Sequence, residues 1–312
     1  MQFPKSFDIK IYKKFNNQLS SFTDIELIDH YNKFGKHEGF LCIEIKNRLD
    51  FFNLINILNV NNGLEIGPLC NMILSDTNIK NKKTLDFFSQ EELINNYKND
   101  INVNINNIIK VDYVMKNINK YTDIINETFD VCVSSHNLEH MPCIVTFLNN
   151  ISSILNKGGY LFLAIPDYRY CFDKYRNPST IFDVLFKYYT KCEKPCPISI
   201  LESSFIRTHN NSSDHWKNFE TTYQNCFNNI NDNFDFINTY KNTIATNIND
   251  IKNIIHNNDT YIDSHCWKLN PETFSIIIEI LLECKLIDLN LIVKYGTYKN
   301  SHEFYVILQK SL

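Results

Sequence analysis

The stretch from Phe129 to Arg176 constrains the fold more than any other part of the chain. Its pattern of apolar residues, polar residues and glycines predicts a strand, a loop, a helix, a tight turn and a second strand. Each predicted strand ends abruptly at polar residues, the first at residues 134–137 and the second at Pro166 and Asp167. The carboxyl ends of parallel strands meet at one edge of a sheet, where open α/β folds bind ligands. The sequence therefore predicts a ligand site formed by these two strand ends.

Strands and helices alternate in the rest of the chain as well. A capping pattern at Ser89 and Glu92 predicts a helix that ends near Tyr97, and Asn270 followed by Pro271 predicts the start of the last helix. Further helices are predicted at residues 47–58 and 143–156, and strands at residues 63–67, 83–87, 108–114, 129–133, 160–165, 289–295 and 303–308. The predicted fold class is α/β, with a doubly wound, mostly parallel, seven-stranded Rossmann-like sheet that ends in a C-terminal β-hairpin.

Length and charge set the domain organisation and limit the partners. A chain of 312 residues exceeds the usual size of a single domain. We therefore expect a helical N-terminal module at residues 1–42 and a main domain at residues 43–312, in which residues 168–262 form an irregular or helical cap insertion. A formal net charge of −4 argues against a nucleic-acid partner, which would require a basic face.

The N-terminus lacks the apolar segment of a signal peptide, and no uncharged run approaches the length of a membrane span. Ten cysteines without a C-x-x-C pair predict reduced thiols rather than a zinc framework. These features predict a soluble, cytoplasmic protein without a membrane span, and they assign no metal site.

The loop after the first predicted strand limits the choice of cofactor. A dinucleotide requires a G-x-G-x-x-G turn, but residues 67–71 have only the first of these glycines, Gly67. S-adenosylmethionine has no phosphate, so a loop with fewer glycines can hold it. Asp86 follows Gly67 by 19 residues, close to the roughly 20-residue interval for ribose recognition. Asp112 is expected to end the third strand and to reach the adenine; the alternative for both acids is a helix cap or a turn.

Several segments together resemble class I S-adenosylmethionine-dependent methyltransferases. They include residues 64–68, 83–86, 111–113 and 157–159, and a narrower branch is marked by S-H-x-x-E-H at residues 135–140 and P-D-x-R-y-x-F-D at residues 166–173. The resemblance covers residues 48–312, and that branch is often associated with polysaccharide or sugar biosynthesis. It implies S-adenosylmethionine as the cofactor and a methyltransferase form of the sheet. The resemblance implies that Glu65, Gly67, Asp86 and Asp112 contact the cofactor. We expect the cofactor site to include their neighbours Pro68, Phe87 and Tyr113, and also Ser134 and Ser135 at the end of the fourth strand.

The N-terminal segment resembles a short module often appended to glycosyltransferases, with the pattern D-x-x-x-Y followed by H-Y-x-x-x-G-x-x-E-G. Thr23 and Glu26 predict a capped helix within it that ends at Gly35. The pattern is carried by Asp8, Tyr12, His30, Tyr31, Gly35, Glu38 and Gly39. The module and the branch imply a sugar, nucleotide-sugar or oligosaccharide acceptor and a glycosyltransferase as a partner. The alternative is that these side chains only fix a small helical hairpin.

Methyl transfer to a hydroxyl requires a base within hydrogen-bond reach of the acceptor. His136, just past the fourth strand, is the first candidate, Asp167 the second and His265 the third. Glu139 and His140 are expected to pack or to fix the loop. The residues expected to bind the acceptor are Arg169, Tyr170, Arg176, His209, His215 and Trp216, unless the arginines and nearby aspartates form a self-contained anchor for the insertion.

The leading hypothesis is a methyltransferase that acts on a hydroxyl or amine of a sugar or glycan intermediate. A second hypothesis keeps the cofactor but has a protein or another small molecule as the acceptor. The third is a non-catalytic, methyltransferase-like binding subunit of a glycan-assembly complex.

Overall fold

The structure is a computed structural model that describes residues 9, 12–13, 16–35, 45–58, 60–116, 120–217, 241–256 and 261–312. Seven strands form one sheet in the order β3-β2-β1-β4-β5-β7-β6. Strands β1 to β5 pair in parallel, whereas β7 pairs antiparallel with both β5 and β6. The bounds are β1 Asn62–Ile66, β2 Asn81–Asp86, β3 Tyr113–Val114, β4 Phe129–Ser135, β5 Leu155–Pro166, β6 Leu289–Tyr295 and β7 Glu303–Lys310. The predicted Rossmann-like sheet with a C-terminal hairpin is confirmed.

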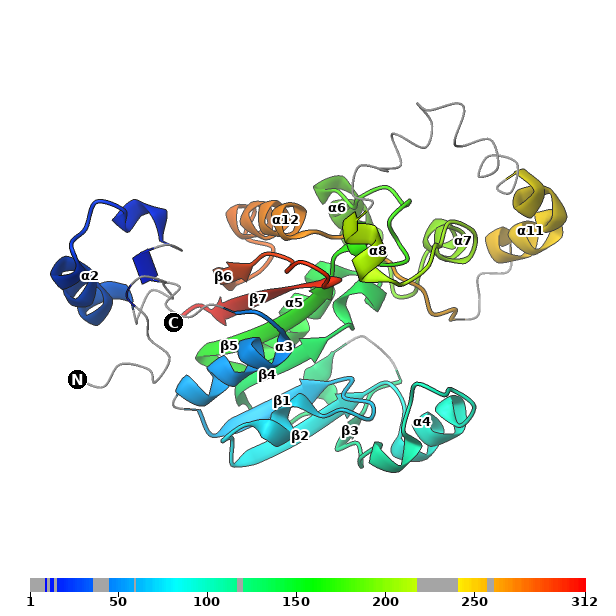
Figure 1. The fold of residues 1–312 in the computed structure, drawn as a ribbon. Coiled ribbons are helices and arrows are strands. Elements are labelled where there is room, and N and C mark those ends of the chain that lie inside the picture. The colour runs from blue at the N-terminus through cyan, green and yellow to red at the C-terminus, as the bar shows by residue number, and fades with distance from the viewer. Residues whose placement is uncertain are drawn as a thin grey trace.

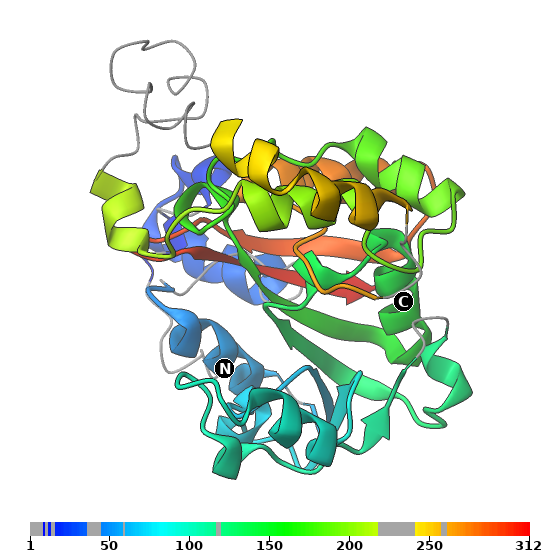
Figure 2. The ribbon, with the colours of Figure 1, turned by 90° about the vertical axis from the view of Figure 1, so that its right-hand side faces the viewer.

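Helices cover both faces of this sheet (Figure 1). Helix α3 packs on one face and helices α5 and α12 on the other, and Figures 1 and 2 show α6, α7 and α11 grouped on the α12 side. The bounds are α2 Asp24–His30, α3 Arg48–Asn53, α4 Gln90–Tyr97, α5 Ile144–Ile154, α6 Ile181–Tyr189, α7 Pro197–Phe205, α8 Ser212–Lys217, α11 Ile248–His256 and α12 Pro271–Glu283. Among the described helices, none has both the length and the apolar character required to cross a bilayer.

The core follows the alternation of side chains along each strand. Cys132 of β4 packs with α5 and α12, whereas its neighbours Val131 and Val133 pack with α3. All three are fully buried. Because both faces are covered, the strands are apolar on both sides, as expected for parallel strands between layers of helices. The polar residues of β4 therefore lie at its two ends, with Asp130 near the start and Ser134 and Ser135 at the carboxyl end.

The predicted helix starts are confirmed by their caps. Thr23 and Glu26 form a capping box at α2, and Ser89 and Glu92 form one at α4. The Asn270 side chain accepts from the Thr273 amide at the start of α12. These bonds satisfy amides that lack a partner within the helix, so local sequence was sufficient to place the three starts.

The expected strand at residues 108–114 is wrong for most of its length, because β3 comprises Tyr113–Val114 alone. Ile108 and Val111 are buried against Leu93 of α4, so their apolar character reflects packing on a helix rather than a strand. Asp112 therefore precedes β3 instead of ending it. Its side chain accepts from the Thr84 amide at 3.0 Å, which corrects the expected place of this acid at the carboxyl edge.

The N-terminal pattern residues that the structure describes hold one another. Tyr12 is fully buried, and its hydroxyl lies 2.9 Å from Nδ1 of His30. A Cβ on Gly35 would lie 2.0 Å from that hydroxyl, so only glycine fits there. This packing favours the alternative role of fixing a small helical unit. Asp8, Glu38 and Gly39 lie outside the described residues.

A buried arginine joins the cap insertion to the segment before α12. The side chain of Arg176 is fully buried and donates to Asp173 Oδ1 at 2.6 Å and to the His265 carbonyl at 2.8 Å. It also lies 3.3 Å from Glu202 of α7. Arg176 thus lies among three segments that are distant in the sequence, which favours the anchoring alternative over direct contact with an acceptor.

We expect Arg176→Met to lower the free energy of unfolding by about 3–5 kcal/mol, because the change leaves Asp173 buried without its cation. Chemical denaturation monitored by circular dichroism measures this loss. Arg207→Met is the matched control: this exposed arginine stacks on Phe172 at 4.7 Å and is worth at most about 1 kcal/mol. Equal losses for the two variants would contradict the anchoring role.

Candidate functional site

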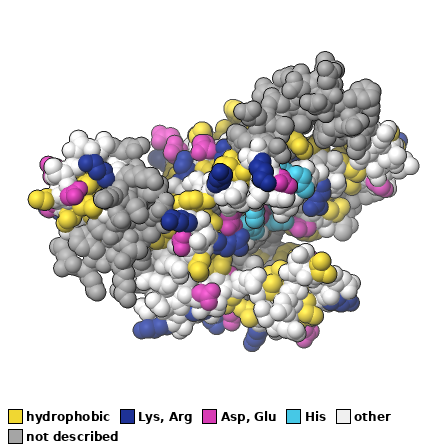
Figure 3. Space-filling view, in the orientation of Figure 1, with side chains coloured by type: hydrophobic (Ala, Val, Ile, Leu, Met, Phe, Trp, Pro, Cys, Tyr) yellow, Lys and Arg dark blue, Asp and Glu magenta, His cyan; other side chains and the backbone are white. Residues whose placement is uncertain are grey.

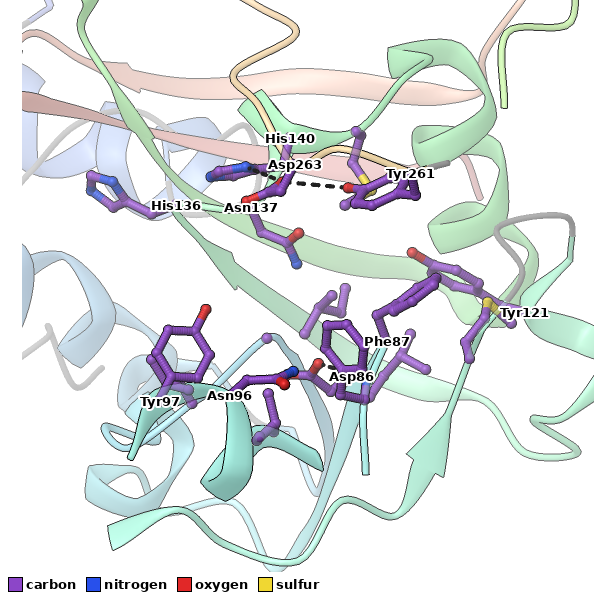
Figure 4. A pocket seen from close by; sticks show the side chains of 18 residues that line it. Asp86, Phe87, Asn96, Tyr97, Tyr121, His136, Asn137, His140, Tyr261 and Asp263 are labelled. Atoms are coloured by element: carbon purple, nitrogen blue, oxygen red, sulfur yellow. Dashed lines mark hydrogen bonds and ion pairs between the residues drawn. The ribbon is translucent and has the colours of Figure 1, made fainter. Parts of the chain in front are cut away.

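A pocket of about 540 Å³ opens at the carboxyl ends of β1, β2 and β4. This volume lies within the range of roughly 300–1,000 Å³ that is typical of small-molecule sites. Figure 4 shows two facing walls, one from the end of β2 and α4 and the other from the end of β4 and the segment before α12. The labelled wall residues are Asp86, Phe87, Asn96 and Tyr97 on one side, and His136, Asn137, His140, Tyr261 and Asp263 on the other.

The loop after β1 lines the pocket at Gly67, which has a φ of +65°. A Cβ at this position would lie 3.1 Å from the Asn137 side-chain nitrogen, so glycine is required both by conformation and by space. Leu69 also has a positive φ, +45°, which brings the loop back beneath the pocket. Pro68 is buried in this loop and is not among the residues that line the pocket.

Glu65 holds this loop from below. Its carboxylate accepts from the amides of Ile73 and Leu74 at 2.9 and 2.8 Å, and its side chain is buried in β1. Burial raises the pKa of Glu65 to about 7, against the opposing effect of the two amide donors. Glu65 does not line the pocket, and its two hydrogen bonds tie β1 to the residues that follow this loop.

Asp86 and Phe87 line the pocket where β2 ends, as the sequence predicts for a ribose-binding position. Asp86 Oδ1 accepts from the Phe88 amide at 3.1 Å, and burial raises the pKa of this carboxyl. The ring of Phe87 stacks on Tyr261 at a centroid distance of 5.8 Å, which connects the two walls. Asp86 therefore presents a carboxylate beside an aromatic surface.

Three other expected cofactor residues lie outside the pocket lining. The hydroxyl of Tyr113 hydrogen-bonds to Glu127. Ser134 and Ser135 end β4, and within the described part of the chain their hydroxyl oxygens have no hydrogen-bond partner. These two serines lie beside the pocket-lining His136, so they stay candidates for the cofactor site.

His136 enters the pocket from a strained backbone. Its φ is +51°, uncommon for a residue with a side chain and frequent at functional sites. Its Nε2 lies 2.8 Å from Glu303 Oε2 on β7, and Arg48 of α3 donates to both Glu303 oxygens at 3.1 and 2.5 Å. Burial alone would raise the pKa of Glu303, but hydrogen bonds from His136 and Arg48 hold it far below its ordinary value. An ionised Glu303 requires Nε2 to be the donor, so in the neutral form of the ring the lone pair is on Nδ1, which lies 3.7 Å from Glu139 Oε1.

The second and third base candidates are engaged elsewhere. Asp167 is fully buried; its oxygens accept from Arg169 at 2.9 and 2.7 Å, and one also accepts from Thr297 at 2.6 Å. His265 Nδ1 lies 2.5 Å from Asp173 Oδ2. Neither Asp167 nor His265 lines the pocket, although the His265 ring lies 4.7 Å from that of His140.

The residues expected to bind the acceptor mainly pack against one another. The Tyr170 ring stacks on Trp216 at 4.1 Å, and the His209 ring stacks on His215 at 4.2 Å. Trp216 donates to the Ser301 carbonyl at 2.8 Å, which ties α8 to the β6–β7 connection. These pairs, together with Arg169 and Arg176, are absent from the pocket lining and form the base of the cap insertion.

The sequence did not identify His140 and Asp263 as wall residues. His140 Nδ1 lies 2.9 Å from Asp263 Oδ1, and both side chains line the pocket. Burial alone would lower the pKa of His140, but the hydrogen bond to Asp263 and the nearby Glu139 charge raise it overall. The S-H-x-x-E-H motif, which contains His140, was the sequence signal that could have identified this residue. In the view of Figure 3, histidine side chains gather near the centre of the molecule.

Comparison with known proteins agrees with this geometry. Residues 88–163 match a family described as a methyltransferase domain. No curated protein matches the chain. The match and the sheet order support a class I S-adenosylmethionine-dependent methyltransferase with S-adenosylmethionine as its cofactor.

Solved structures of methyltransferases are also similar at low identity. N-methyltransferase NodS from Bradyrhizobium japonicum is 12% identical, with a TM-score of 0.38 over 85% of this chain and 93% of that chain. An O-methyltransferase family protein from Burkholderia thailandensis is 8% identical, with a TM-score of 0.37 over 96% of this chain and 63% of that chain. A methyltransferase from Clostridium acetobutylicum is 17% identical, with a TM-score of 0.30 over 46% of this chain and 58% of that chain.

The raised pKa of Glu65 predicts a specific pH dependence of stability. A carboxyl with a higher pKa in the folded state binds its proton more tightly there, so its effect favours folding below the unfolded value and is lost as pH rises. We expect the contribution of Glu65 to the free energy of unfolding to fall by roughly 3 kcal/mol between pH 4.5 and about pH 7. Glu65→Gln should remove this slope, measured as the difference between wild-type and variant urea unfolding at each pH. Parallel curves for the two proteins would contradict the prediction.

Proposed function

We propose that this protein transfers a methyl group from S-adenosylmethionine to a hydroxyl, or an amine, of a sugar or glycan intermediate. The observation that carries the proposal is the pocket at the sheet edge, which is lined by Asp86 on one wall and by His136 on the other. One wall has the features of a nucleoside site, and the other carries a base oriented by Glu303.

The described residues fit the proposed cofactor. Asp86 would accept hydrogen bonds from the two ribose hydroxyls, and Phe87, Met115 and Tyr121 supply the apolar lining that an adenine requires. Gly67 lines the pocket without a side chain, so the amino-acid portion of the cofactor could approach its backbone closely. Asp112 precedes β3 and does not lie at the carboxyl edge of the sheet. In our proposal the residues that follow β3 contact the adenine instead.

The cofactor supplies a methyl group on a positively charged sulfur, which is already a good leaving group. The protein then has to orient the acceptor, exclude water and accept a proton. In our proposal His136 accepts the acceptor proton at Nδ1, because Nε2 donates to Glu303. Glu303 keeps the imidazole in that orientation, and Arg48 keeps Glu303 ionised.

A sugar acceptor is supported by the S-H-x-x-E-H branch motif and by the N-terminal pattern, both associated with glycan assembly. A glycosyltransferase partner is part of the same proposal. Methyl-label assays on nucleotide-sugars, oligosaccharides and protein extracts test the acceptor class, and labelling of protein alone would overturn the glycan proposal. Calorimetry with S-adenosylmethionine tests the non-catalytic alternative, which predicts no binding at millimolar cofactor.

Asp86→Asn should weaken cofactor binding about 10- to 100-fold, because the amide replaces one acceptor of the diol by a donor. Isothermal titration with S-adenosylhomocysteine measures the change. Asp288→Asn is the matched control, since Asp288 is exposed and lies outside the pocket lining. Unchanged affinity in Asp86→Asn would remove this residue from the ribose site.

His136→Asn should reduce kcat about 10²- to 10⁴-fold, as is typical for loss of a general base, and cofactor affinity should stay within about threefold. Glu303→Gln should reduce kcat less, because the base is present but poorly oriented. His256→Asn, on the exposed face of α11, is the control. Full turnover in His136→Asn would assign the proton transfer to another group.

A further inference from the structure

Glu139 is a buried carboxylate without a hydrogen-bond partner. It lies in the short turn Leu138–His140 after β4, and 1% of its surface is exposed. Among the residues that the structure describes, no group donates a hydrogen bond to either of its oxygens. An isolated buried charge is strongly unfavourable unless it is paired or binds a cation. The site therefore lacks a positive group that would satisfy Glu139.

Three imidazole nitrogens surround this carboxylate at distances beyond a hydrogen bond. From Oε1 of Glu139, His136 Nδ1 lies at 3.7 Å, His140 Nε2 at 3.9 Å and His265 Nε2 at 4.0 Å. Hydrogen bonds between nitrogen and oxygen are shorter than about 3.2 Å, so charged imidazoles in these positions leave the oxygens unsatisfied. The spacing leaves room for an atom between them.

Two of these histidines, His140 and His265, bind an aspartate through the ring nitrogen that points away from Glu139. His140 Nδ1 is bound to Asp263 at 2.9 Å, and His265 Nδ1 is bound to Asp173 at 2.5 Å. Both Nε2 atoms are thereby directed at Glu139. A histidine that ligates a metal almost always donates its other nitrogen to a carboxylate, a carbonyl or water. The surroundings of His140 and His265 have this arrangement.

We propose that Glu139, His140 and His265 bind a divalent transition-metal ion beside the cofactor pocket. One ligand atom from each residue lies within 4.8 Å of the others, and the two pairs with Glu139 measure 3.9 and 4.0 Å. Two ligands at about 2.1 Å from one ion are at most about 4.2 Å apart, so side-chain shifts of less than about 1 Å close the triad. Two imidazoles and one carboxylate suit Zn²⁺, Mn²⁺, Fe²⁺ or Co²⁺ better than Mg²⁺ or Ca²⁺, which prefer oxygen ligands.

The position of the triad indicates its use, and this step rests on the proposed function. Of the three proposed ligands, His140 lines the cofactor pocket together with His136, so in our proposal the open side of the triad faces the acceptor space. A metal with three protein ligands keeps positions free for substrate oxygens, and two adjacent hydroxyls of a sugar would occupy them. The acceptor class is therefore a vicinal diol.

The proposed step requires no reactant other than the acceptor and S-adenosylmethionine. The metal would acidify one bound hydroxyl, whose proton passes to Nδ1 of His136, located 3.7 Å from the Glu139 oxygen. A bond forms between that oxygen and the methyl carbon, and the bond from carbon to sulfur breaks. The electron pair stays on sulfur, which gives S-adenosylhomocysteine.

The test is a titration of the chelator-treated full chain with Co²⁺, followed by its visible absorption and by calorimetry. Wild type should bind one Co²⁺, and Glu139→Gln and His265→Asn should each weaken this binding at least tenfold. Glu283→Gln, on the exposed end of α12, is the matched control and should bind as wild type does. No Co²⁺ binding by wild type, or equal binding by Glu139→Gln, would overturn the proposal.

A second measurement separates loss of metal from loss of fold. Because the Glu139 side chain has no hydrogen bond among the described residues, the nearly isosteric Glu139→Gln should keep the melting temperature of the metal-free protein. Added Co²⁺ should raise the melting temperature of wild type but not of the variant. A rise of equal size in both proteins would overturn the proposal.

Cofactor calorimetry distinguishes this failure from failure of the proposed function. S-adenosylhomocysteine should bind metal-free wild type and Glu139→Gln equally, since Glu139 does not line the pocket. Cofactor binding without Co²⁺ binding would refute the metal site and leave the methyltransferase proposal intact. Co²⁺ binding without cofactor binding would support the metal site and refute the methyltransferase proposal.

Discussion

The pocket wall that includes the segment before α12 depends on the interactions of the buried Arg176 guanidinium. The guanidinium binds Asp173, the carbonyl of His265 and the α7 residue Glu202, so it connects the cap insertion to the segment before α12. Asp173 in turn fixes the imidazole of His265. A buried ion pair of this kind adds little net stability but is sensitive to loss of one partner. The role of this ion pair is to orient residues. Through it, the cap insertion positions side chains at the sheet edge that the sheet alone could not hold.

Local sequence was sufficient for most of the sheet and for the pocket residues that lie at the strand ends. Strands end where apolar runs stop, so Gly67, Asp86, Phe87 and His136 could be placed at the carboxyl edge without knowledge of the tertiary structure. Helix starts followed from caps whose bonds span three residues. The strand expected at residues 108–114 failed because burial beneath α4 gives the same apolar signal as a strand. Asp112 was misplaced for that reason.

The contacts that orient the histidines after β4 could not be predicted, because their partners are distant in the chain. His136 is bound to Glu303, 167 positions away, and His140 to Asp263, 123 positions away. No periodicity links such residues. Asp167 occupies the expected strand end, but its oxygens accept hydrogen bonds from Arg169 and Thr297. Its position in the sequence therefore did not show whether its carboxylate was free to act as a base. A strand-end acid is a candidate for chemistry only when its partners are known.

Unfavourable local features gather at the carboxyl end of β4. His136 has a left-handed backbone, and among the described residues the Ser134 and Ser135 hydroxyls and the buried Glu139 carboxyl lack hydrogen-bond partners. Each feature destabilises the isolated fold. Elsewhere in the described chain such features are more scattered, as at Leu69 with its positive φ and at Ser264 with its unpaired hydroxyl. Such strain persists where a bound group offsets it. The concentration of these features within six residues, rather than any single one, favours our proposal that the reacting atoms lie beside the turn that follows β4.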